Sequence, residues 1–145
     1  MKLAAVTALA TLMWTACTVA GPLPPAPVEL GQPFALKIGE SAHFAGQALR
    51  VGFAGVVADS RCPKGEHCVW AGDATVRVWL QQGAEQKQSL ELHTAVGAAQ
   101  AARVGNHELR LLRLDPYPVS GRDIASAEQL ATLALSPATG AAPER

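Results

Sequence analysis

The sequence has no excess of charge of either sign, no repeat and no hydrophobic run as long as a transmembrane helix. Its 145 residues carry 12 Lys plus Arg and 12 Asp plus Glu, so nothing predicts binding to nucleic acid or to an anionic membrane surface. There are no heptads, no blocks of like charge and no tandem repeats. These absences exclude coiled coils and solenoids and leave a single globular domain as the expectation.

The motifs of the familiar hydrolases and nucleotide-binding enzymes are also missing. The sequence has no Gly-x-Ser-x-Gly elbow, no phosphate-binding glycine loop and no His-Glu-x-x-His. Four histidines lie on separate segments: His43, His67, His93 and His107. Paired carboxylates such as Asp59 and Asp73 have the chemistry for acid–base work. We expect no enzyme activity and no cofactor, with an unrecognised hydrolase as the alternative.

The N-terminal stretch MKLAAVTALATLMWTAC has one lysine and then no charge from residue 3 to residue 16. Roughly 14 apolar or small residues suit a signal peptide, whereas a transmembrane helix needs about 20. Residues 14–17 resemble a bacterial lipobox, with Trp14 where leucine is usual, and cleavage after Ala20 is the alternative. We therefore expect an exported protein, either lipid-anchored to the inner or outer membrane through Cys17 or soluble in the periplasm or outside the cell.

The rest of the chain divides by composition. Residues 1–20 form the expected signal peptide, 21–33 a proline-rich tether, 34–137 the domain, and 138–145 a flexible tail. Apolar and polar residues alternate in the domain, which predicts seven strands: 34–38, 42–44, 49–57, 74–80, 90–92, 109–114 and 131–135. The expected fold is all-β, mainly antiparallel, in a sandwich or small barrel.

Four irregularities are expected along these strands. Gly55 and the Leu111-Leu112 pair each interrupt the alternation and predict bulges. Residues 95–104 contain alanines interrupted by glycine and predict a loop with at most one helical turn. Residues 123–130 predict one turn of helix before the last strand.

The segment DSRCPKGEHCVWAG, residues 59–72, concentrates the reactive side chains. Either cleavage removes Cys17 from thiol chemistry and leaves Cys62 and Cys68, an even pair that favours a disulfide in an oxidising compartment. Pro63 and Gly65 between them predict a turn. The alternatives are a metal site that uses His67 with both cysteines and a redox switch, although the spacing is typical of neither zinc sites nor Cys-x-x-Cys motifs.

Residues in and after this segment are the candidates for binding a partner. We expect Trp70 to pack on the disulfide or cap the core, with an exposed anchor as the alternative. Arg61 is expected to pair with Asp59 or Asp73 in a bidentate fork. The remaining binding candidates, Arg77 and Trp79, lie opposite the apolar face of their strand. We expect Trp79 to enter a second core layer, with display of both side chains to solvent as the alternative.

The segments Ser60-Arg61-Cys62-Pro63, Gly65 and residues 68–72 resemble a group of small bacterial exported proteins and lipoproteins with an SRCP-x-G-x-x-CVWAG-like core. A preceding strand, LRVGFAGVVAD, and the later segment HELRLLRLDPYPVSG share the likeness, which runs from about residue 34 to residue 136. The resemblance implies an all-β domain with a disulfide, facing the envelope or the outside. It carries over no catalytic residue, because the group has no established activity.

These features predict an exported binding or accessory module of the cell envelope. Its expected partners are a membrane, through a lipid on Cys17, and an envelope protein or ligand; no nucleic acid is expected. The alternatives are an inhibitor-like module that presents the Cys62–Cys68 loop and a periplasmic metal-handling protein that uses His67 with other histidines.

Overall fold

The computed structural model describes residues 25–139. It contains eight strands and one short 3₁₀ helix: β1 Pro33–Lys37, β2 Ser41–His43, β3 Leu49–Asp59, β4 Ala74–Gln82, β5 Gln88–His93, β6 Ala101–Val104, β7 His107–Asp115, η1 Ser126–Glu128 and β8 Leu130–Pro137. The expected signal peptide, Cys17 and residues 21–24 of the proline-rich segment lie outside the described residues.

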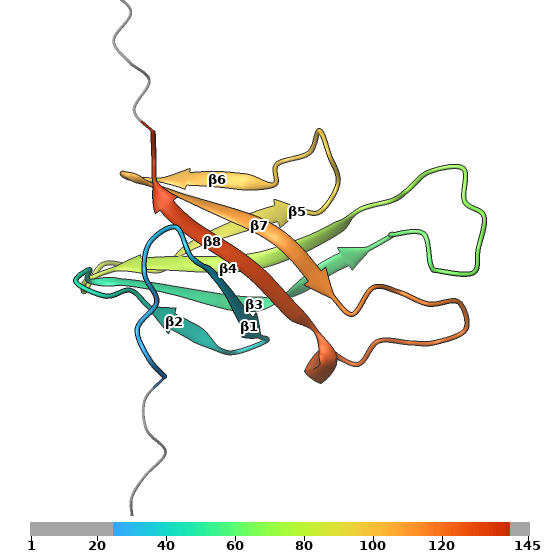
Figure 1. The fold of residues 1–145 in the computed structure, drawn as a ribbon, viewed down its shortest axis with the longest axis horizontal. Coiled ribbons are helices and arrows are strands. Elements are labelled where there is room, and N and C mark those ends of the chain that lie inside the picture. Colours follow the sequence, from blue (N-terminus) through green and yellow to red (C-terminus); the bar gives the residue numbers. More distant parts are fainter. Residues whose placement is uncertain (1–24, 140–145) are drawn as a thin grey trace, which may run out of the picture.

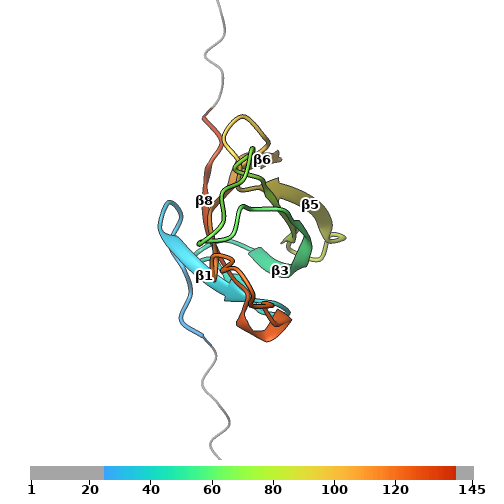
Figure 2. The same cartoon turned by 90° about the vertical axis from the view of Figure 1, so that its right-hand side faces the viewer.

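The strands form two four-stranded antiparallel sheets that face each other. One has the order β1-β8-β7-β6 and the other β2-β3-β4-β5. The sheets enclose a common core and do not close into a barrel, as the ribbon and its end-on view show (Figures 1 and 2). Of the two expected architectures the sandwich is confirmed and the small barrel is not.

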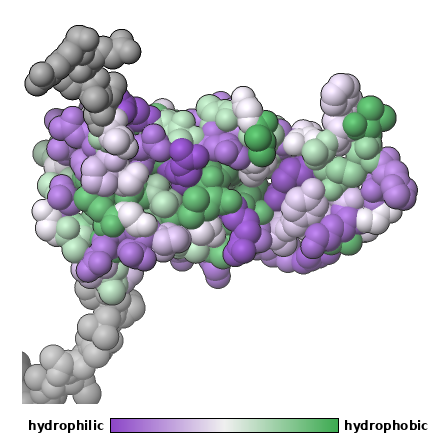
Figure 3. All heavy atoms as spheres, turned by 45° about the horizontal axis from the view of Figure 1, so that its top comes forward, coloured by the Kyte–Doolittle hydropathy of each residue, from purple (hydrophilic) through white to green (hydrophobic). Residues whose placement is uncertain are grey.

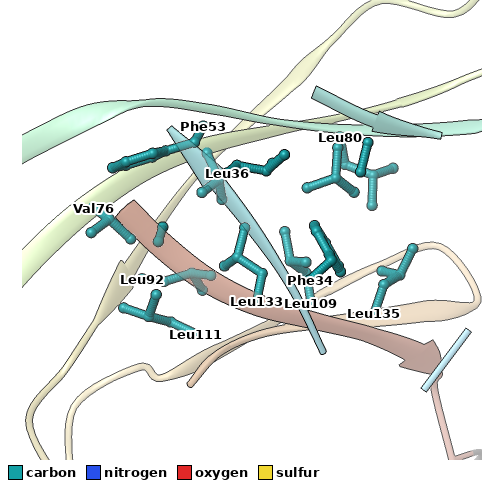
Figure 4. Close-up of a cluster of buried hydrophobic side chains, with 14 of the residues drawn as sticks. Phe34, Leu36, Phe53, Val76, Leu80, Leu92, Leu109, Leu111, Leu133 and Leu135 are labelled. Carbon is teal, nitrogen blue, oxygen red and sulfur yellow. The ribbon is translucent and has the colours of Figure 1, made fainter. Parts of the chain in front are cut away.

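Period-two alternation explains why each strand buries one face. In β4 the buried side chains of Ala74, Val76, Val78 and Leu80 alternate with exposed or half-buried ones. The buried faces of both sheets meet in a layer of aliphatic and aromatic side chains (Figure 4). Phe34 and Phe44 close one part of the core edge to face, with ring centroids 5.3 Å apart.

Both predicted bulges are present. The β3–β4 register shifts between Phe53 and Gly55, and the β7–β8 register shifts between Leu111 and Arg113. The second bulge turns Leu112 outward while Leu111 and Leu114 stay in the core. A doubled leucine thus places one large apolar side chain on the surface.

The structure corrects two other expectations about the backbone. Residues 101–104, expected in a loop, form β6, which pairs with β7 from Ala101↔Arg110 to Val104↔His107. The domain also begins before residue 34, because Val28 N donates to His43 O at 2.8 Å and Gly31 N to Leu135 O at 2.7 Å. The expected helical turn within residues 123–130 is present as η1.

Strand directions sort the connections between two ends of the sandwich. The β3–β4, β5–β6 and β7–β8 connections lie at one end, which we call the stapled end, and the β2–β3, β4–β5 and β6–β7 connections at the other. The N-terminal segment enters beside β2, away from the stapled end (Figure 1). Within residues 25–139, no helix has the length and apolar character needed to cross a membrane.

Candidate binding surface

The stapled loop, residues 60–73, extends the β3–β4 hairpin beyond the sandwich. Ser60 N donates to Asp73 O at 2.7 Å, and Cys62 N donates to Ala71 O at 2.8 Å. The disulfide Cys62–Cys68, with Cα atoms 5.9 Å apart, closes the outer part of the loop and confirms that prediction. Gly72 has a φ of 74°, and a Cβ there would lie 1.8 Å from Ser60 O. Only glycine therefore lets the two sides of the loop come this close.

Arg61 fixes the base of the stapled loop and is 8% exposed. Its Nε and Nη2 donate to the two carboxylate oxygens of Asp59 at 2.8 and 2.6 Å. Its Nη1 and Nη2 also donate to the carbonyl oxygens of Leu114 at 2.8 Å and Pro116 at 3.2 Å. The predicted fork with Asp59 is confirmed. Arg61 is thus a structural clamp between the two sheets, since its donors are taken up within the domain.

A second set of contacts joins the stapled loop to the β7–β8 connection. Lys64 N donates to Pro118 O at 3.0 Å, and Ser120 N donates to Lys64 O at 3.1 Å. The hydroxyl of Ser120 donates to Glu66 Oε1 at 2.8 Å. The Tyr117 ring lies between these contacts, with Arg61 Cζ 5.1 Å and Lys64 Nζ 5.6 Å from its centroid. The β7–β8 connection therefore holds the first half of the stapled loop, at Lys64 and Glu66.

Asp73 ties the stapled loop to the β5–β6 connection. Its Oδ1 accepts from the backbone N–H groups of Thr94 at 3.0 Å and Ala95 at 2.9 Å, and from the Thr94 hydroxyl at 3.1 Å. Its Oδ2 lies 2.6 Å from His93 Nδ1. Burial acts to raise the pKa of Asp73, but these hydrogen bonds outweigh it, so the pKa lies below its usual value. His93 is half-buried in this contact.

Large apolar side chains collect on the surface of the stapled end. Trp70 is 81% exposed and Val69 90%, which overturns the expectation that Trp70 packs on the disulfide or caps the core. Of the seven large hydrophobics that are exposed within residues 25–139, six lie at this end: Val69, Trp70, Val96, Leu112, Tyr117 and Val119. The surface view shows apolar side chains on the protruding end (Figure 3). Clusters of this kind mark interaction surfaces.

A groove of about 540 Å³ lies between the stapled loop, the β5–β6 connection and the end of β7. Its lining residues are Arg61, Lys64, Ala71, Gly72, Thr94, Ala95, Val96, Leu112, Arg113, Leu114, Asp115 and Tyr117. The volume falls within the range of about 300–1,000 Å³ that is typical of binding pockets.

The other two binding candidates lie on a different surface, the outer face of the β2-β3-β4-β5 sheet. Arg77 is exposed and pairs with Glu91 at 2.8 Å. Trp79 is half-buried and does not enter a second core layer, because within residues 25–139 no further sheet packs on this face. Its ring packs on Gly52, where a Cβ would lie 2.1 Å from the ring, and Lys87 Nζ lies 4.1 Å from the ring centroid. Trp79 is thus a shield over the backbone of β3.

The described residues contain no group of three or more His, Cys, Asp or Glu side chains able to hold a metal ion. Cys62 and Cys68 are bonded to each other, so they are not ligands for the site that His67 was considered for. Asp59 and Asp73, the paired carboxylates considered for acid–base work, are each engaged by their own partners, Arg61 and His93.

Of the residues that line the groove, the sequence had suggested only Arg61 as a binding candidate; those it missed include Lys64, Val96, Leu112 and Asp115. Only Leu112 had a signal, since a doubled leucine at a bulge must expose one of the pair. The others come from three segments that the fold brings together.

Three comparisons with known proteins give no relative for this chain. No family model, no curated protein and no solved structure matches it. The resemblance to the exported proteins with an SRCP-x-G-x-x-CVWAG-like core therefore stays a prediction.

Proposed function

We propose that this protein is an exported binding module of the cell envelope, anchored by a lipid on Cys17, which docks a partner protein through its stapled end and catalyses no reaction. The exposure of Trp70, which lies in the stapled loop between Cys68 of the disulfide and the paired Ala71, carries the proposal. Tryptophan dominates binding hot spots, and a loop that is already ordered loses little entropy on binding. Trp70 is 81% exposed, so the packing of residues 25–139 does not require an indole at this position.

The orientation of the domain supports the same role. The N-terminal segment enters beside β2, away from the stapled end (Figure 1). A lipid on Cys17 would leave residues 18–24 as a link, with a reach of roughly 25 Å when extended. Such a link favours an orientation in which the stapled end faces away from the membrane, toward other envelope or external proteins. Where the partner is an enzyme, the same docking role is that of an inhibitor.

Photo-crosslinking from position 70 tests the docking role. A photoreactive p-benzoylphenylalanine replaces Trp70 in one strain and Ala84 in another, in the cells that make the protein. Ala84 lies in the β4–β5 turn, at the opposite end of the sandwich, so it is the matched control. We expect a discrete crosslinked protein from position 70 and none from position 84. Equal or absent crosslinks at both positions would reject docking through Trp70.

Intact mass tests the anchor. Protein extracted from the membrane fraction should carry a diacyl or triacyl increment on Cys17 and a two-dalton deficit for the disulfide, and a Cys17→Ala chain should leave that fraction. A mass that begins at Gly21 would show a soluble exported form and reject the anchor, while leaving the docking surface intact.

A further inference from the structure

The groove beside the stapled loop combines an apolar lining with a net positive charge. Its lining includes three cations, Arg61, Lys64 and Arg113. Arg61 is neutralised by Asp59 at 2.6 Å and Arg113 by Asp115 at 2.6 Å. Lys64 forms no ion pair with any carboxylate of residues 25–139. The pairs cancel, so the groove carries one uncompensated positive charge.

The backbone that carries this charge is held in place before any ligand arrives. The backbone of Lys64 is held by hydrogen bonds with Pro118 and Ser120, and its ammonium lies 5.6 Å from the centroid of the Tyr117 ring. The cation therefore stands over an aromatic wall, where an incoming carboxylate would meet it with little ordering cost.

The rest of the groove suits an aliphatic or aromatic side chain. Ala71 and Gly72 form one wall, Ala95 and Val96 another, and Leu112 lies exposed on the bulge of β7. Small residues on one wall and a large apolar residue opposite leave room for a side chain to insert. Burying that side chain against Leu112 would remove apolar surface of both partners from water.

We propose that the groove binds an extended segment of the partner protein in which an apolar side chain stands next to a carboxylate. The carboxylate pairs with Lys64 Nζ, and the apolar side chain lies against Leu112 and Val96. This inference rests on the proposed docking role and specifies the chemistry of the segment that docks. A lipid surface is the less suitable occupant, because the N-terminal segment enters away from this end.

A displayed library of random heptapeptides tests the inference without a known partner. The whole protein is immobilised through a C-terminal tag. Because β8 ends at the opposite end of the sandwich, the stapled end stays accessible. We expect enriched peptides to carry Asp or Glu adjacent to a large apolar residue. The synthetic winners should shift the amide resonances of Gly72, Ala95 and Leu112, and should bind several-fold more weakly in 500 mM than in 50 mM salt.

Charge variants then separate the groove from the rest of the surface. Lys64→Glu should weaken the winning peptides by about tenfold or more, and Lys64→Arg should retain most of the affinity. Lys87→Glu makes the same change of charge beyond the far end of β4 and should have no effect. Melting temperatures report whether each variant is folded, and Leu112→Trp, which obstructs the groove without changing charge, provides an independent test.

Several outcomes would overturn the inference. These are enrichment without an acidic excess, failure to enrich any peptide that depends on Lys64 or Leu112, and binding of phosphatidylglycerol vesicles that Lys64→Glu abolishes. Failure of the groove and failure of the docking role are distinguishable. A crosslink at position 70 with no peptide in the groove would support docking through Trp70 alone. Groove-bound peptides without a crosslink would support the groove as a peptide site and reject Trp70 as the anchor.

Discussion

Arg61 Nη1 donates a 2.8 Å hydrogen bond to the carbonyl oxygen of Leu114, 53 residues further along the chain. The donor belongs to the stapled loop of one sheet, and the acceptor lies on β7 of the other. Together with the Arg61–Asp59 fork, this bond makes the stapled end one unit across both sheets. The loop that carries Trp70 is therefore supported by the core of the domain.

Removing this clamp should cost much more than removing an exposed pair of similar local geometry. We expect Arg61→Ala to lower the free energy of unfolding by about 3 kcal/mol, because it leaves Asp59 partly buried without a partner. The matched control is Arg113→Ala, which breaks an exposed Arg–Asp pair at the same 2.6 Å and should cost less than about 1 kcal/mol. Urea unfolding measures both, and equal losses would show that Arg61 is no clamp.

Gly72 sets how closely the two sides of the stapled loop approach. In Gly72→Ala the new Cβ would meet Ser60 O and Arg61 Cα at 1.8 and 2.8 Å, so the hairpin extension must open. We expect a loss of about 2 kcal/mol or more in unfolding free energy. Gly97→Ala is the control, because Gly97 also has a positive φ, of 90°, but no atom lies near its Cβ position. That control should lose about 1–2 kcal/mol, from backbone strain alone.

The strands of the sandwich could be predicted because one buried face imposes period-two alternation on each of them. The bulges at Gly55 and Leu112 were predictable for the same reason, since each breaks that period. β6 was not, because its sequence AARV offers small residues and only Val104 is buried. Pairing with β7, rather than its own pattern, makes this segment a strand.

The candidate site was predictable only where its contacts are local. The disulfide and the Arg61–Asp59 fork join residues six and two positions apart. The prediction that Trp70 packs on the disulfide or caps the core was wrong. Trp70 lies in a short extension of a hairpin beyond the core, and no periodicity in the sequence reveals such an extension. The groove was missed because its three walls come from segments that are distant in the sequence.

On the outer face of the β2-β3-β4-β5 sheet, the Trp79 ring packs tightly on Gly52. Gly52→Ala should displace the ring, since the Cβ would lie 2.1 Å from it, and should cost about 1–3 kcal/mol. In a Trp79→Ala background the same substitution should cost far less, because the obstacle is gone. A double-mutant cycle of unfolding free energies measures this coupling. Additive effects would mean that the ring already moves freely away from Gly52.

The disulfide should stabilise the domain modestly. Its ring spans a sequence separation of six, so loss of the cross-link should cost about 2 kcal/mol through the entropy of the unfolded chain. We expect a Cys62→Ser, Cys68→Ser double variant to remain folded and to bind partners through Trp70 more weakly. Urea unfolding and amide hydrogen exchange in the stapled loop measure the two effects. Complete unfolding would mean that the hydrogen bonds of the loop depend on the cross-link.

Asp73 should make stability fall in acid in a defined way. Its pKa in the folded protein lies below the usual 3.8 because His93, Ala95 and Thr94 hydrogen-bond the carboxylate more strongly than burial opposes its charge. The unfolded chain therefore binds the proton first. The stabilisation from Asp73 is complete above that usual pKa and is lost as the pH falls through it to the lower folded-state pKa.

The test compares the wild type with Asp73→Asn in urea unfolding from about pH 5 to pH 2. The difference between their unfolding free energies should be constant at the upper end of this range and shrink steadily below about pH 4. Asp123→Asn is the control at an exposed carboxyl of the β7–β8 connection, and its difference from the wild type should stay near zero throughout. A difference for Asp73→Asn that does not change with pH would show that the carboxylate makes no charge-dependent bonds, and its role in holding Thr94 and Ala95 beside the groove would then fall to neutral hydrogen bonding.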